Sequence, residues 1–243
     1  MLKGMRSWHP SFSGSCCYGN NSSRRGAEYG FNPIHPSPGT LETRRGLAIG
    51  LAIVIASMLI LFTVPSSYFV SATFASTSCM VGVAYAQRAL AAKQPRLRSV
   101  VIGLVSASLL YCIFFGGAWL ISTYHPYGIT SASETSIYSL ISSPANPFYL
   151  QVAVLLFDSA GYESFFRGVL QRRLRPRLGL LAAPAVASLD AVLHVATLNP
   201  LWVGTTLVTD TLWGVTYHYG GTQSSFTSHF VWDIAIFILR PIR

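Results

Sequence analysis

Charged side chains are scarce in this chain. Of its 243 residues, 10% are charged and 51% are hydrophobic, whereas a soluble domain carries about a quarter charged residues. So few charges cannot cover a surface that faces water, and we therefore expect lipid to cover much of the molecule. The composition excludes an ordinary soluble domain and predicts an integral membrane protein.

Cysteine is also rare, with four residues in the whole chain. Cys16 and Cys17 lie in a polar segment, and Cys79 and Cys112 are isolated within apolar runs. This pattern contains no CxxC or Cys/His spacing of a zinc cage, and it does not predict a disulfide framework.

The net charge of +9 could indicate nucleic acid as a partner, but the positions of the charges argue against it. Almost all of the 17 Lys and Arg residues flank apolar runs, which is how a membrane protein sets its orientation. We expect the lipid bilayer, and no nucleic acid, as a partner.

Three regions follow one another along the chain. Residues 1–45 form a basic tail rich in Ser, Gly and Asn, predicted to be disordered. Residues 46–147 contain the first membrane helices and an outer loop, and residues 148–243 form a helical core. The predicted fold is all-α, a polytopic transmembrane helix bundle.

Seven apolar runs approach the 20 or so residues that a spanning helix needs. The last run is short, so both six and seven spans are compatible with the sequence. The runs are 46–64, 68–86, 99–122, 148–170, 179–197, 200–218 and 224–239.

Basic residues alternate between the two ends of these runs. The tail, the 87–98 loop and the 171–178 turn are rich in Lys and Arg, whereas the 123–147 loop has neither. Since positive residues gather on the cytoplasmic side, we predict a plasma-membrane protein with a cytoplasmic N-terminus.

Ionisable residues are concentrated in the last four runs. Each is costly at bilayer depth unless it is paired or hydrated, and such residues commonly mark functional sites. The alternative is that they join helices by hydrogen bonds. The residues are Asp158, Glu163, Asp190, His194, Asp210, His229 and Asp233.

The spacing of these residues predicts a common site. Glu163 lies 15 residues before Leu178 and His194 lies 15 residues after Gly179, which places both about 22 Å from the turn. We therefore expect Glu163 and His194 to face each other. Asp190 and His194 are four residues apart, and so are His229 and Asp233, so each pair shares a helix face. Two His-carboxylate faces in one bundle favour activation of a water molecule.

Three short segments resemble the motifs of the CPBP family of membrane proteases. The segment 162–171 is similar to its Glu-Glu-x-x-Phe-Arg-Gly motif, Asp190–His194 occupies the place of Phe-x-x-x-His, and His229–Asp233 matches His-x-x-x-Asn/Asp. The family includes Rce1-type CAAX prenyl proteases and the Abi homologues. The resemblance covers roughly residues 148–239.

The resemblance implies an intramembrane endopeptidase that cuts a membrane-anchored, CAAX-like or peptide substrate. By position, His194 would orient the attacking water, and His229 with Asp233 would support the oxyanion. An ion pair with Arg167 would instead give Glu163 a structural role. The candidate catalytic residues are Glu163, Asp190, His194, His229 and Asp233, and the candidate substrate-binding residues are Tyr162 and Arg167.

We expect no cofactor and no metal ligands, because a Glu/His-activated water suits these residues. Two His with a carboxylate could nevertheless hold zinc, which remains an alternative.

Two positions depart from the family pattern. Tyr162 stands where the first glutamate, the expected base, would be, and Asp190 stands where the phenylalanine would be. Either Asp190 replaces the base, or the protein is a proteolytically inactive homologue that acts as a membrane scaffold or binding protein. A proton-coupled transporter is a third hypothesis, against which the sequence shows no repeated halves.

Overall fold

The computed structural model describes residues 41–90, 96–124 and 147–239. These ranges are helical with short turns and contain no strand, which confirms the predicted all-α membrane bundle. The predictions of a disordered tail and an outer loop fall almost entirely outside the described residues.

Every apolar run predicted from the sequence forms a helix, with ends within a few residues of the expected ones. The α-helices are α1 Leu41–Thr63, α2 Phe69–Ala86, α3 Leu97–Tyr124, α5 Phe148–Phe165, α6 Arg172–Leu178, α7 Ala182–His194, α8 Pro200–Gly220 and α9 Thr222–Asp233. Two π-helical segments continue α5 and α9, at Phe166–Gln171 and Ile234–Leu239. Short 3-10 turns lie at Ser66–Tyr68, Gly179–Leu181 and Val195–Thr197.

Four stretches of the described chain are long and apolar enough to cross a membrane. The last of them contains α5, α6 and α7 together. They are Arg45–Thr63, Phe69–Ala86, Leu97–Tyr124 and Phe148–Thr197. The choice between six and seven spans therefore stays a prediction.

The tight connections around α8 bring distant residues back into one bundle. The Asn199 side chain accepts hydrogen bonds from the backbone of Leu201 and Trp202 at the start of α8, which is a common way to cap a helix. At the other end of α8, Gly221 has φ +79°, a conformation that favours glycine. This turn returns α9 along α8.

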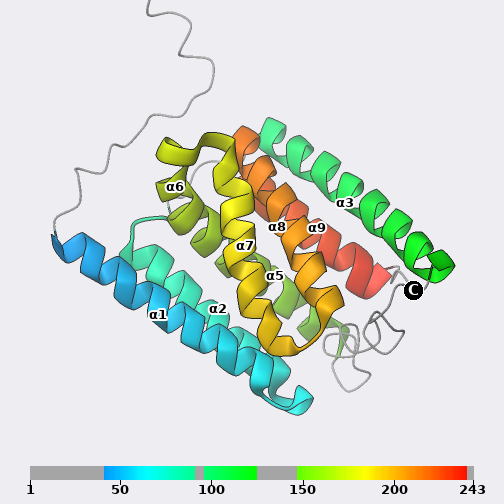
Figure 1. Ribbon diagram of the computed structural model, residues 1–243, viewed down its shortest axis with the longest axis horizontal. Helices are drawn as coiled ribbons and strands as arrows, with labels where there is room; N and C mark the ends of the chain where they lie inside the picture. The colour runs from blue at the N-terminus through cyan, green and yellow to red at the C-terminus, as the bar shows by residue number, and fades with distance from the viewer. Residues whose placement is uncertain (1–40, 91–95, 125–146, 240–243) are drawn as a thin grey trace, which may run out of the picture. The chain divides into compact units, whose positions relative to one another are not determined.

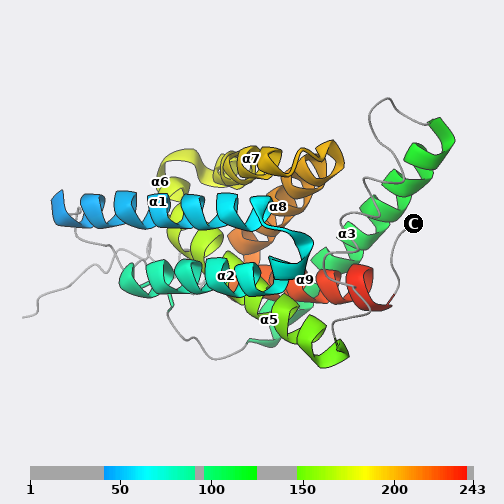
Figure 2. The ribbon, with the colours of Figure 1, turned by 90° about the horizontal axis from the view of Figure 1, so that it is seen from below.

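The helices form a closed circuit (Figures 1 and 2). Helix α1 packs on α2, α2 on α5, α5 on α9, α9 on α8, α8 on α7, and α7 returns to α1. Helix α3 lies along α9 and also contacts α8. The circuit encloses the space in which the polar residues meet.

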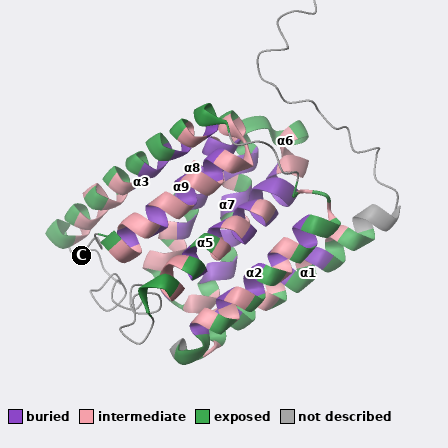
Figure 3. Cartoon of the chain, turned by 180° about the vertical axis from the view of Figure 1, so that it is seen from behind, coloured by how far each residue is buried: buried purple, intermediate pink, exposed green. Residues whose placement is uncertain are grey.

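The polarity of the bundle is the reverse of that of a soluble protein (Figure 3). Outward faces of α1 and α3 are exposed and apolar, whereas several charged residues are fully buried. The exposed side chains include Ile49, Ile60, Val105, Phe115 and Trp119, and the buried ones Glu163, Arg167, Asp190 and Asp210. Such an apolar exterior requires lipid to cover it.

Basic segments gather at one end of the bundle. Arg173 Nη2 donates a 2.6 Å hydrogen bond to Gln87 Oε1, which joins the end of α2 to α6. The Arg96 backbone N–H donates to Gln223 Oε1 at 3.0 Å. This grouping is what the predicted orientation requires, although the side of the membrane on which this end lies stays a prediction.

Candidate active site

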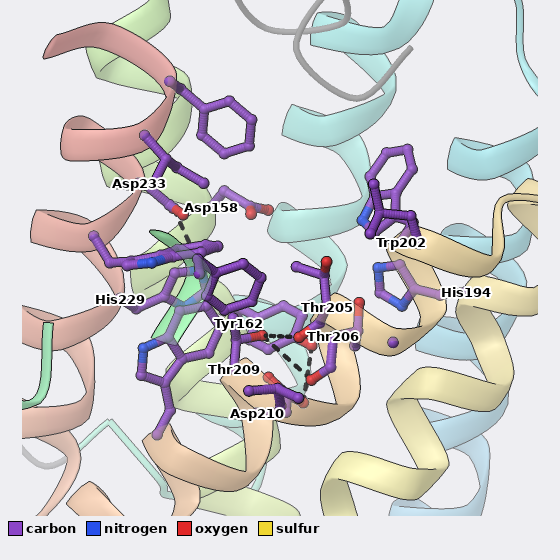
Figure 4. A pocket seen from close by; sticks show the side chains of 18 of the residues that line it. Asp158, Tyr162, His194, Trp202, Thr205, Thr206, Thr209, Asp210, His229 and Asp233 are labelled. Atoms are coloured by element: carbon purple, nitrogen blue, oxygen red, sulfur yellow. Dashed lines mark hydrogen bonds and ion pairs between the residues drawn. The ribbon is translucent and has the colours of Figure 1, made fainter. Parts of the chain in front are cut away.

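A cavity of about 410 Å³ lies inside the helix circuit (Figure 4). Its wall is mostly apolar and comes from α1, α2, α3, α5, α8 and α9, with His194 added from the end of α7. The titratable side chains that line it are Asp158, Tyr162, His194, Asp210, His229 and Asp233. The volume and the lining of this cavity resemble those of small-molecule binding sites, where a few polar groups converge in an apolar pocket.

Two carboxylates and two aromatic rings contact the imidazole of His229. Its Nδ1 lies 3.0 Å from Glu163 Oε1, and its Nε2 lies 3.3 Å from Asp233 Oδ2. The imidazole stacks on Trp213 with ring centroids 3.7 Å apart, and the edge of Tyr162 packs against it at 5.3 Å. The predicted His229–Asp233 face is confirmed, and the ring has one orientation at the cavity wall.

The prediction that Glu163 and His194 face each other is wrong. Glu163 is fully buried and points at His229 of α9, while its neighbour Tyr162 reaches α7. Successive helix residues point about 100° apart, so only one of the two can face α7. The depth estimate also assumed an unbroken α-helix, whereas the segment Phe166–Gln171 is π-helical.

Asp190 lies behind Tyr162 rather than on the cavity wall. Its carboxylate is fully buried and accepts a short hydrogen bond from the Tyr162 hydroxyl. The same hydroxyl lies 3.1 Å from Asp210 Oδ2. The phenol therefore connects α5 to both α7 and α8 and separates Asp190 from the cavity.

His194 lines the cavity across from His229 (Figure 4). Its Nδ1 lies 3.0 Å from the Asp190 carbonyl oxygen and 3.4 Å from Asp190 Oδ2. The rings of Phe62 and Trp202 pack against it at 4.5 and 5.8 Å. Because Nδ1 is directed at Asp190, Nε2 is the nitrogen left for a ligand in the cavity.

Arg167 is a fully buried cation between two carboxylates. Its Nε lies 3.4 Å from Glu163 Oε2, which confirms the predicted pair, and its Nη2 lies 2.9 Å from Asp210 Oδ1. Buried charges are tolerated when they are paired in this way. Arg167 does not line the cavity, so this geometry makes it a tie between α5 and α8.

The sequence analysis counted Asp158 and Asp210 among the ionisable membrane residues but not among the candidate catalytic or substrate-binding residues, and both line the cavity. Asp158 accepts a 2.9 Å hydrogen bond from Thr77 Oγ1 of α2, and Asp210 contacts Tyr162 and Arg167. The spacing of Asp158 four residues before Tyr162 was the available signal for the first. For Asp210 the only signal was its position within an apolar run, because its partners Tyr162 and Arg167 are distant in sequence.

No group of three or more His, Cys, Asp or Glu residues that could hold a metal ion occurs within residues 41–90, 96–124 and 147–239. Both nitrogens of His229 already face carboxylates. The donor set therefore does not fit a zinc site of three or four protein ligands. A metal-free site stays a prediction.

These features define a helical membrane protein whose bundle brings titratable side chains together at one cavity. Residues 144–235 match the family of type II CAAX prenyl endopeptidases, Rce1-like. This match agrees with the family that the motifs predicted, and the matched range contains all seven predicted site residues. No curated protein and no solved structure matches the chain.

Proposed function

We propose that the protein is an intramembrane endopeptidase that hydrolyses a peptide bond in a membrane-anchored, CAAX-like or peptide substrate. The observation that carries this proposal is the cavity lined by His194 and His229 in an apolar wall. Peptide hydrolysis needs a bound water and a polarised carbonyl, and a cavity of about 410 Å³ within the bundle has room for both.

His194 would hold the attacking water through Nε2. Asp190 contacts Nδ1 through its backbone carbonyl and its carboxylate, so it supports a single orientation of the imidazole. A carboxylate that fixes a catalytic histidine in this way is a recurrent arrangement in hydrolases. Asp190 would thus be a positioning residue, acting through His194.

His229 and Asp233 would lie on the side of the scissile carbonyl oxygen. The stacking of His229 on Trp213 and its contact with Glu163 keep the imidazole at a fixed place. Preorganised polar groups of this kind stabilise charge that develops in a transition state. Glu163 and Arg167 would support the site without contacting the substrate.

A proteolytically inactive scaffold or binding protein is the second candidate function. The observation that favours it is Tyr162, which stands at the position of the expected base and covers Asp190. In that case the apolar cavity would bind a membrane-anchored segment without cutting it.

The deciding experiment measures cleavage by the purified full-length protein in lipid nanodiscs. A broad library of membrane-anchored peptides is incubated with wild type and with His194→Ala. We expect cleavage by wild type and a loss of about 10²–10⁴-fold in the variant, as for removal of a positioned catalytic group. If neither protein cleaves any peptide and both still bind the peptides, the result would instead support the scaffold or binding protein.

A further inference from the structure

Asp158 is a carboxylate of α5 that lines the cavity one helical turn before Tyr162. Residues four apart lie on the same face of a helix. Its side chain therefore opens onto the same space as the position where the family motif has its first glutamate. The Tyr162 phenol separates Asp190 from this space but does not separate Asp158 from it. Figure 4 shows the Asp158 carboxylate at the pocket.

Helix α2 holds Asp158 in place. Thr77 Oγ1 donates a 2.9 Å hydrogen bond to Asp158 Oδ1. Thr77 comes this close because Gly161 lies opposite it, and a Cβ at Gly161 would overlap the Thr77 methyl group. One carboxylate oxygen is therefore fixed, while Oδ2 carries no bond to Thr77.

Asp158 also lies within electrostatic reach of both site histidines. It interacts with His229 and with His194. Across α9 it interacts with Asp233, whose Oδ2 accepts a 3.3 Å hydrogen bond from Ser159, the next residue of α5. The charged and titratable groups that interact with Asp158 are thus the two histidines, Asp233 and, from α7, Asp190.

We propose that Asp158 is the general base of the reaction, which is a role that rests on the proposed endopeptidase function. A water held by His194 bonds through its oxygen to the scissile carbonyl carbon, and Asp158 Oδ2 accepts a proton from it. The carbonyl π electron pair moves to the carbonyl oxygen. When the C–N bond breaks, Asp158 returns the proton to the amide nitrogen, so one water is consumed and a carboxylic acid and an amine are formed.

The test compares Asp158→Asn and Asp158→Glu with wild type in nanodiscs, with one cleavable membrane-anchored peptide. We expect Asp158→Asn to lower kcat by about 10²–10⁴-fold with KM within about threefold of wild type. Asp158→Glu keeps a carboxylate and should retain at least about tenfold more activity than Asp158→Asn. Fluorescence anisotropy of the labelled peptide should show unchanged binding to both variants.

A second pair of variants leaves the carboxylate in place. Thr77→Val removes the hydrogen bond to Asp158 and should lower kcat about tenfold, the usual effect of losing a bond to a charged group. Ser78→Ala is the matched control, because the exposed Ser78 hydroxyl donates to the carbonyl of Phe74 in its own helix and not to Asp158. It should cleave like wild type.

The outcomes separate the two proposals. If wild type cleaves and Asp158→Asn cleaves within about threefold of it, the role of Asp158 is overturned and the endopeptidase stands. If wild type cleaves none of the peptides, the endopeptidase is overturned and the base role falls with it. If Asp158→Asn aggregates, Thr77→Val decides, and an unchanged kcat in that variant overturns the proposal.

Discussion

Two departures from the family motifs meet in a single contact at the scale of individual residues. The motifs expect a glutamate at position 162 and a phenylalanine at position 190, and here Tyr162 donates its hydroxyl hydrogen to Asp190. Aromatic ring and carboxylate have exchanged places across the α5–α7 contact. The exchange moves a carboxylate away from the cavity wall but places it against His194 Nδ1.

Asp190→Asn should therefore lower cleavage by about 10²-fold, because the imidazole of His194 loses the carboxylate that supports its orientation. Tyr162→Phe removes a hydroxyl that is directed at Asp190 and has no role in the proposed reaction, so it should lower cleavage less than about tenfold. Initial rates with one peptide compare the two variants. The opposite order of the two effects would contradict the positioning role of Asp190.

Arg167 is expected to determine stability. Arg167→Met leaves the buried carboxylates of Glu163 and Asp210 without their cation, and breaking a buried pair on one side costs about 3–5 kcal/mol. Thermal unfolding in detergent should show a much lower Tm. The matched control is Arg177→Met, at an exposed position of α6, and equal Tm values for both variants would argue against this role.

The absence of a metal requirement is a further prediction at this scale. Since His229 uses both nitrogens toward carboxylates, cleavage should be unchanged after dialysis against a chelator. Activity assays before and after dialysis, with added Zn²⁺ in a third sample, measure this. Loss of activity on dialysis with recovery on zinc addition would establish a metal enzyme.

At the scale of the helices, close approaches fix how each helix is rotated about its axis. A Cβ at Gly214 of α8 would lie 2.6 Å from the Cβ of Ala183 in α7 and 2.9 Å from its Cα. Small residues commonly allow membrane helices to approach in this way. This contact brings Asp210, one turn earlier on α8, to Tyr162 and Arg167.

Gly214→Ala should destabilise the protein by about 1–3 kcal/mol, because the added methyl group forces α7 and α8 apart. The control is Gly116→Ala in α3, where a Cβ would meet nothing within 4 Å. Thermal unfolding of both variants in the same detergent compares them. A Gly214→Ala protein as stable as wild type would show that the helices have room to separate.

The sequence predicted well where each helix begins and ends, but it predicted poorly how each helix is rotated about its axis. All seven apolar runs form helices because length and apolar character are local properties. The predicted partner of His194 was Glu163, whereas the structure places Tyr162 toward α7. A rotation of about 100° decides between neighbours, and it depends on side chains from other helices.

At the scale of the whole molecule, the apolar exterior and the polar interior agree with a membrane bundle whose basic segments lie at one end. We predict that this end faces the cytoplasm, as the positive-inside rule requires. A cleavable tag before Met1 should resist an added protease in sealed right-side-out vesicles and be removed after permeabilisation. Cleavage of the tag in intact vesicles would reverse the predicted orientation.

The sequence by itself determined that this is a helical membrane protein and which side chains have to be sheltered from lipid. Both follow from composition and from the free energy of a charge in a bilayer, which does not depend on the partner. Only the tertiary structure decided which of these side chains face one cavity. Asp158 reaches the cavity and Asp190 is covered by Tyr162 because contacts such as Gly161–Thr77 and Gly214–Ala183 set the approach of helices far apart in sequence.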